Sequence, residues 1–185
     1  MKRGLVIAGI GLIVGGIGGL AVAGAGVTLV KQTSSNAFCI ACHEMTWPEA
    51  SYHDNVHFKN AAGVQAQCKD CHLLSDPWPA YLWQKATFGA RDVTMHLLGV
   101  IDTREEYEAK RPELAEEVWA WLEETDSATC RTCHTDAAMA VSTAPEMAQR
   151  VHQAAAQGGQ TCITCHKGVG HGVPEQEAAA ADAGS

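Results

Sequence analysis

The sequence predicts a mainly α-helical protein with low secondary-structure content: one N-terminal transmembrane helix and a compact domain of two halves. Three observations predict this class. Residues 4–30 carry no charged side chain. The remainder contains four Cys-x-x-Cys-His runs, which fall into two pairs. Aromatic residues form only 6% of the chain, too few for an ordinary side-chain core, so something other than side chains must fill the interior.

The N-terminal segment, residues 1–30, is expected to be a membrane anchor. At about 1.5 Å per residue, the uncharged part spans roughly 40 Å, which is enough to cross a bilayer. Lys2 and Arg3 precede it and favour a cytoplasmic N-terminus. A cleaved signal peptide is the alternative, since Ala21-Val22-Ala23 has the small-x-small form, but the apolar segment is too long for one. We therefore predict a single pass through the inner (cytoplasmic) membrane, with residues 31–173 in the periplasm.

All eight cysteines belong to the four runs. Two cysteines at this spacing can form thioethers to one haem, and the histidine that follows can bind its iron. Two Cys-x-x-Cys pairs alone could bind zinc, but here every pair is followed by histidine and no cysteine is left over. The sequence therefore predicts four covalently bound haem c groups. The attachment cysteines are Cys39 and Cys42, Cys68 and Cys71, Cys130 and Cys133, and Cys162 and Cys165.

The spacing of the runs predicts two dihaem halves within one domain. The first cysteines of runs one and two are 29 residues apart, those of runs three and four 32, and the gap between the pairs is 62. A helix over 103–124 is expected in this gap. Thr103 and Glu106 form a capping-box pattern at its start, and Pro112 is expected to split it. Residues 174–185 are expected to be a disordered tail.

Each run supplies one histidine as an axial iron ligand: His43, His72, His134 and His166. Second ligands must come from elsewhere, and the free histidines are His53, His57, His96, His152 and His171. His171 follows the fourth run so closely that it should serve a neighbouring haem. His53 and His57, four residues apart on an expected helix face, compete for one ligand role. Met45 follows only the first run, so that haem can be ligated differently from the others.

Charge and aromatic patterning indicate the class of partner. The formal net charge of −8 gives no reason to expect nucleic acid. Residues 77–83 contain two tryptophans and a tyrosine, and such amphipathic rings are favoured at a membrane interface. We therefore expect membrane lipid as a partner of the periplasmic domain.

Several segments together resemble the NapC/NirT family of membrane-anchored tetrahaem quinol dehydrogenases, which includes NrfH-type subunits. The resemblance covers roughly residues 1–173, and residues 101–134 are most similar to the NapC branch. It rests on the N-terminal helix, the series of runs and four stretches: Phe-Cys-Ile-Ala-Cys-His-Glu-Met at 38–45, Ile-Asp-Thr at 101–103, Arg-Pro-Glu-Leu-Ala at 111–115, and Thr-Cys-Ile-Thr-Cys-His-Lys-Gly at 161–168.

The resemblance implies a set of iron ligands. Haem 1 would take Met45 rather than His43, with its other face open or loosely covered by Asp92. Haem 3 would pair His134 with His171, and haem 4 would pair His166 with His57. Haem 2 keeps His72, and its sixth ligand would be a partner subunit's residue or an internal histidine such as His96.

The resemblance also implies a function. Lys85 and Asp92 match a quinol pocket, so the protein would oxidise membrane quinol (menaquinol or ubiquinol) and pass electrons through the haems to a periplasmic reductase subunit. A solvated helix face is the simpler interpretation of these two residues. An anchored electron-storage or relay cytochrome and a catalytic multihaem reductase are the alternative functions. The protein is thus expected to be an electron-transfer subunit rather than a terminal reductase.

Overall fold

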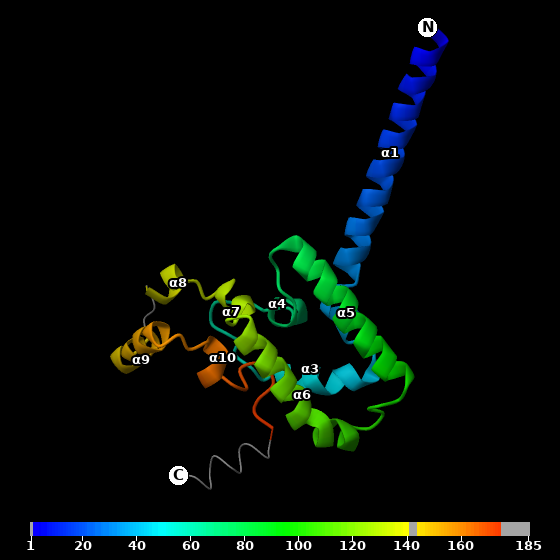
Figure 1. The fold of residues 1–185 in the computed structure, drawn as a ribbon. Helices are drawn as coiled ribbons and strands as arrows, with labels where there is room; N and C mark the ends of the chain where they lie inside the picture. The colour runs from blue at the N-terminus through cyan, green and yellow to red at the C-terminus, as the bar shows by residue number, and fades with distance from the viewer. Residues whose placement is uncertain (1, 141–143, 175–185) are drawn as a thin grey trace. The chain divides into compact units, whose positions relative to one another are not determined.

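The computed structural model describes residues 2–140 and 144–174, and in these ranges it contains helices and no strand (Figure 1). The helical class predicted from the sequence is therefore confirmed. The chain forms two compact units, Met1–Cys39 and Ile40–Ser185. The helices are α1 (Lys2–Gln32), α2 (Asn36–Cys39), η1 (His43–Met45), α3 (Thr46–Tyr52), α4 (Cys68–His72), α5 (Trp78–Leu97), α6 (Arg104–Glu124), α7 (Ala128–Arg131), α8 (Asp136–Ala140), α9 (Glu146–Gln157) and α10 (Cys162–Cys165).

The first unit is dominated by α1, a helix of 31 residues. Within the part of the chain that the structure describes, one segment, Arg3–Gln32, is long and apolar enough to cross a membrane. Its side chains are exposed all round, as expected of a helix that packs against lipid rather than protein. The helix ends two residues beyond the predicted boundary, with Lys31 in its last turn. Residues 175–185, most of the predicted tail, lie outside the described residues.

In the second unit, short helices hold three of the haem-attachment runs. Helix α4 begins at Cys68 and α10 begins at Cys162, while α7 contains Cys130. A single helical turn brings residues three apart onto one side, so both cysteines of a run can reach one macrocycle. The helical turn therefore brings both cysteines of these three runs to one side.

The side-chain core of this unit is very small. Trp119 and Leu122 of α6 pack with Ile163 of α10, and Tyr81 is the other buried hydrophobic residue described. Large apolar side chains on α5 stay exposed, including Leu97 at 77%. So little buried apolar surface cannot hold a domain of this length together. The missing core volume fits macrocycles attached at the four runs.

Helix α6 is continuous, so the expected break at Pro112 is wrong. The capping box at its start is confirmed, since Thr103 accepts a hydrogen bond from the Glu106 amide and the Glu106 carboxylate accepts one back. Proline removes one backbone hydrogen bond from the helix interior. Here helix α6 is held on both sides of the proline, by the cap before it and by the buried Trp119 after it.

The two histidines after the first run do not share a helix face, contrary to expectation. Helix α3 ends at Tyr52, and the chain then turns through residues 53–60. His53 stacks on Phe58 with ring centres 4.1 Å apart. His57 is directed elsewhere, with Nδ1 3.2 Å from the carbonyl oxygen of Val169. The turn therefore separates a local packing residue from one that reaches across the domain.

Candidate haem centres

The histidine of the second run lies opposite His171. The ring centres of His72 and His171 are 6.1 Å apart. Nδ1 of His171 donates to the carbonyl oxygen of Pro48 at 2.9 Å and lies 3.2 Å from Oγ of Ser51. This leaves Nε2 of His171 for a metal. Desolvation, followed by the charge of His171, lowers the pKa of His72 to about 4 although the residue is exposed, and this favours the neutral form that binds metals.

Arg111 of α6 holds the loop that carries His171. Its guanidinium donates to the backbone carbonyl of His171. Its Nη2 also lies beside Gly172, 3.6 Å from the place that a Cβ on this residue would occupy, and the φ of Gly172 is +74°. Burial is the main cause that lowers the pKa of His171. The ring is therefore fixed from both ends, by Arg111 at its backbone and by Pro48 at Nδ1.

The histidine of the third run lies opposite His57. Their ring centres are 6.2 Å apart. Nδ1 of His57 contacts two acceptors, the carbonyl oxygen of Val169 at 3.2 Å and Oδ1 of Asn55 at 3.1 Å. A hydrogen bond at one ring nitrogen fixes the tautomer and leaves the other nitrogen for a metal, a common arrangement of metal-binding histidines. The contacts of Nδ1 therefore leave Nε2 of His57 for a metal, with the ring of His134 close by.

The histidine of the fourth run stacks with His152 of α9, with ring centres 5.9 Å apart and planes inclined by 30°. His152 shares its helix face with Ala148 and Ala155, four residues before it and three after it. All three residues are partly buried, whereas most of α9 is exposed. The small neighbours leave room for a flat group beside the imidazole.

These three ring pairs test whether the residues fit haem. A metal–imidazole bond is about 2 Å long, and the ring centre lies about 1 Å behind the nitrogen, so two axial imidazoles have centres about 6 Å apart. The three pairs measure 5.9–6.2 Å, and each combines one histidine of a run with one free histidine. His43 of the first run and the free histidine His96 form a fourth pair with ring centres 6.1 Å apart, so this distance alone does not distinguish the first run. Haem iron accepts histidine on both faces. The side chains thus fit haem at runs two, three and four.

The first run has a different arrangement. Nε2 of His43 donates to the carbonyl oxygen of Asp102 at 3.2 Å, and Nδ1 lies 3.3 Å from the Glu44 carboxylate. Both ring nitrogens of His43 therefore face protein oxygens. A nitrogen that donates a proton to a carbonyl has no lone pair left for iron. His43 is thus oriented differently from the other three histidines.

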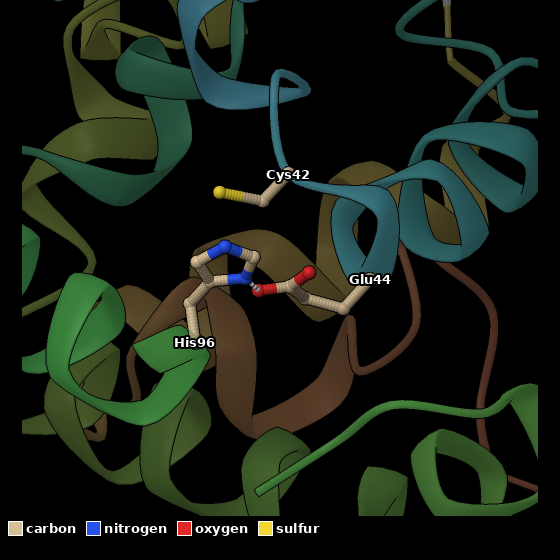
Figure 2. A group of neighbouring side chains, drawn as sticks. All are labelled: Cys42, Glu44 and His96. Atoms are coloured by element: carbon tan, nitrogen blue, oxygen red, sulfur yellow. Dashed lines mark hydrogen bonds and ion pairs between the residues drawn. The ribbon is translucent and has the colours of Figure 1, made fainter. Parts of the chain in front are cut away.

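Glu44 and His96 come together beside Cys42 (Figure 2). Nδ1 of His96, near the end of α5, lies 2.7 Å from Oε1 of Glu44. Ligand atoms of the three residues all lie within 4.8 Å of one another. The Glu44 side chain is only 15% exposed, and its Oε2 accepts no hydrogen bond among the described residues. The cluster belongs to the first haem-attachment run, because Cys42 is one of its two thioether positions.

Lys85 and Asp92 lie on the same face of α5 as His96, because the three residues follow the helical repeat at spacings of seven and four. His96 and Asp92 lie near the first run: His96 contacts Glu44 beside Cys42, and burial, followed by the charges of Glu44 and Asp92, raises the pKa of the Cys42 thiol. Desolvation likewise raises the pKa of the Asp92 carboxyl above 3.8, with Arg91 acting in the opposite direction. This face of α5 therefore turns towards the first run.

Met45, the predicted sulfur ligand of the first haem, ends η1 and is 38% exposed.

Neighbouring runs contact one another. Helix α4 packs on α7, and Ser75 Oγ lies 3.5 Å from Thr132 Oγ1. Cys71 is exposed, yet desolvation by its surroundings, followed by the charge of Cys130, raises the pKa of its thiol to about 11. Buried Ser127 accepts a hydrogen bond from the Ile163 amide at 3.2 Å, which links the third and fourth runs. The attachment sites of haems 2, 3 and 4 are thus contiguous, across the boundary expected between two dihaem halves.

The structure brings the predicted histidines together in combinations other than those that the resemblance implied. His171 lies opposite His72 rather than His134, and His57 lies opposite His134 rather than His166. His166 instead faces His152, which the sequence presented only as one of five free histidines. The only sequence feature that could have indicated a ligand role for His152 is the pair of alanines on its helix face, four residues before it and three after it.

Together, the four runs and the opposed histidine rings define a multihaem c-type cytochrome. Comparison with known proteins agrees: residues 1–176 match the NapC/NirT cytochrome c family, N-terminal region. The chain belongs to this family. Covalent haem c is therefore its cofactor, attached at the four Cys-x-x-Cys-His runs.

Curated relatives are similar over most of the chain. The cytochrome c-type protein TorY of Escherichia coli O157:H7 is 42% identical over 94% of this chain. The denitrification system component NirT of Stutzerimonas stutzeri is 38% identical, covering 89% of this chain and 81% of NirT. The cytochrome c-type protein NapC of Escherichia coli K12 is 34% identical, covering 89% of this chain and 82% of NapC. The chain spans about half (46%) of the length of TorY.

Proposed function

We propose that this protein is a membrane-anchored tetrahaem cytochrome c that oxidises quinol at the membrane surface and passes electrons to a periplasmic reductase. The observation that carries the proposal is the face of α5 with Lys85, Asp92 and His96, directed at the run whose histidine is oriented differently. The first run thus differs from the other three in the hydrogen bonds of its histidine, and it lies next to an acid and a base. Such asymmetry suits an entry point for electrons.

The exposed side of α5 supports contact with the membrane. Next to the polar face lies an apolar ridge of Leu82, Trp83, Val93 and Leu97, which are 37%, 72%, 53% and 77% exposed. Tryptophan is favoured where lipid meets water, and a ridge without charge suits lipid. The chain carries its own apolar anchor, and Lys2 and Arg3 before it favour a periplasmic haem domain at the inner membrane.

Haems 2, 3 and 4 would be held by the opposed pairs His72 and His171, His134 and His57, and His166 and His152. Met45 would bind at the first run, since both nitrogens of His43 face protein oxygens. Bound haem supplies iron that takes up and releases one electron at a time. The contacts between runs two, three and four keep the later sites close, which favours transfer between them.

Oxidation of quinol to quinone releases two electrons and two protons. The carboxylate of Asp92 would accept the first proton from a quinol hydroxyl and release it to periplasmic water, and it would then accept and release the second proton in the same way. The raised pKa makes it a stronger base than an ordinary aspartate. The Lys85 ammonium would donate a hydrogen bond to the opposite quinol oxygen. Electrons would leave singly to the attachment site at Cys42. The periplasmic acceptor is a reductase, in line with a relative described as a denitrification system component.

The test is reduction of the full-length holoprotein in proteoliposomes by menadiol, a menaquinol analogue. Lys85→Ala and Asp92→Asn should each lower the rate about 10²-fold or more, the scale of losing a positioned acid–base group. The wild-type rate should fall as pH drops through the raised pKa of Asp92, because the protonated carboxyl cannot accept a proton. In Asp92→Asn the rate should no longer fall with pH in this range.

Matched controls are Lys59→Ala and Asp54→Asn, which remove exposed charges that pair with each other away from this helix. Dithionite should reduce all variants alike. Unchanged menadiol rates in Lys85→Ala and Asp92→Asn would refute the quinol site and favour an electron-storage or relay cytochrome.

A further inference from the structure

Gly89 occupies the middle of α5, in line with the residues of the proposed quinol site. It lies four residues after Lys85 and three before Asp92, so all three share one helix face. Glycine is among the least favourable residues in a helix interior, because it loses the most backbone freedom on folding. Gly89 is the one glycine among the 20 residues of α5.

The position of a side chain at 89 is open. A Cβ placed on Gly89 meets no other atom within 4 Å, so no neighbouring protein group requires a glycine there. Its φ is not in the left-handed region that favours glycine either. Neither backbone conformation nor protein packing thus accounts for the missing side chain. Gly89 lies on the same face of α5 as His96, whose ring is grouped with Cys42 and Glu44.

We propose that Gly89 is a specificity-determining residue of the quinol site, where the flat quinol ring lies against the backbone of α5. Lys85 and Asp92 are about 10 Å apart along the helix axis. A para-quinol has its two oxygens at opposite ends of one ring, and each oxygen needs a partner at about 2.8 Å. The ring therefore fits between the two side chains, over the residue midway between them. This inference rests on the proposed quinol oxidation.

The experiment uses full-length holoprotein in proteoliposomes with menadiol as the probe. Gly89→Ala should raise the KM for menadiol about tenfold or more, the effect of one unwanted methyl group in a site shaped for its ligand. The same variant should unfold at a higher temperature, because alanine is the better helix former. Gly89→Ser provides a second variant of similar size. The variant should thus be more stable than the wild type and yet bind menadiol less well.

Ala90→Val is the matched control. It adds bulk at the adjacent residue, which lies on the apolar side of α5, and should leave the KM for menadiol unchanged. Electron paramagnetic resonance of each variant without quinol should match the wild-type haem signals. A shifted haem signal in Gly89→Ala would overturn the inference, since the space would then belong to the macrocycle.

The other outcomes separate this inference from the function on which it rests. An unchanged KM in Gly89→Ala, together with slow reduction of Asp92→Asn, refutes the role of Gly89 and leaves quinol oxidation standing. Unchanged kinetics in both variants refutes both. A raised KM in Gly89→Ala and Gly89→Ser, with unaltered haem signals, supports both.

Discussion

At the scale of single residues, the hydrogen bonds of histidine rings distinguish the haem sites. His57 and His171 each bond a carbonyl oxygen through Nδ1 and leave Nε2 free. His43 instead uses Nε2 to donate to Asp102, and His96 is held by Glu44. Since the donor and acceptor roles of the two ring nitrogens decide which one can bind metal, these contacts separate ligand candidates better than sequence spacing does.

The ligation of the first haem can be tested at Met45. Met45→His should replace a sulfur ligand with a nitrogen ligand and lower the reduction potential of that haem, since methionine raises the potential relative to histidine. Electron paramagnetic resonance should then show a changed signal for that haem, because a nitrogen replaces the sulfur at the iron. Met147→His, on an exposed residue of α9, is the control. Spectra and potentials identical to wild type would exclude Met45 as a ligand.

At the scale of elements, α6 organises the haem domain although it carries no attachment cysteine. Its buried Trp119 and Leu122 pack on the fourth run, and Arg91 of α5 donates a hydrogen bond to its Glu117 at 2.6 Å. Arg111 on the same helix bonds the loop that presents His171 to the second run. One helix thus connects the proposed quinol face with ligands of later haems.

Arg111→Gln should weaken the hold on the His171 loop. Loss of a hydrogen bond to a charged group costs about 1.5–3 kcal/mol, so the loop should open part of the time. We expect a fraction of haem 2 to become high-spin, visible by electron paramagnetic resonance, and a lower Tm. Arg104→Gln removes a mostly exposed arginine of the same helix as the control. A fully low-spin spectrum at wild-type stability would contradict this role of Arg111.

At the scale of the whole molecule, the haems must take the place of an apolar core. The described residues bury only four large apolar side chains, whereas the chain is 46% hydrophobic. Burial of apolar area stabilises a fold by about 25 cal/mol per Å², so a core this small cannot offset the entropy of ordering the domain. Binding of the cofactor and folding should therefore be coupled, as in small metal domains.

The periplasmic domain should not fold when haem attachment is prevented. Chain produced in cells that cannot attach haem should be digested rapidly between residues 40 and 174, while α1 stays protected in membrane or detergent. Limited proteolysis followed by mass spectrometry measures this, with the holoprotein as the control. A protease-resistant haem-free domain with a cooperative unfolding transition would contradict the coupling.

Short-range sequence patterns predicted many features of the fold and of the haem sites correctly. The anchor, the four attachment sites, the helical class and the cap at Thr103 each depend on residues within a few positions of one another, so spacing and helical geometry predict them. The prediction failed at Pro112 and for the shared helix face of His53 and His57, where contacts distant in the sequence outweigh local preference.

The sequence by itself thus determined that this protein is anchored to a membrane and binds four haem c groups, because both properties follow from short-range chemistry. Only the tertiary structure decided which free histidine faces which run. His57 and His134, or His72 and His171, are brought together by packing between distant segments, and five free histidines allow many combinations that spacing cannot rank. The same packing turns one face of α5, on which Gly89 lies, towards the first run.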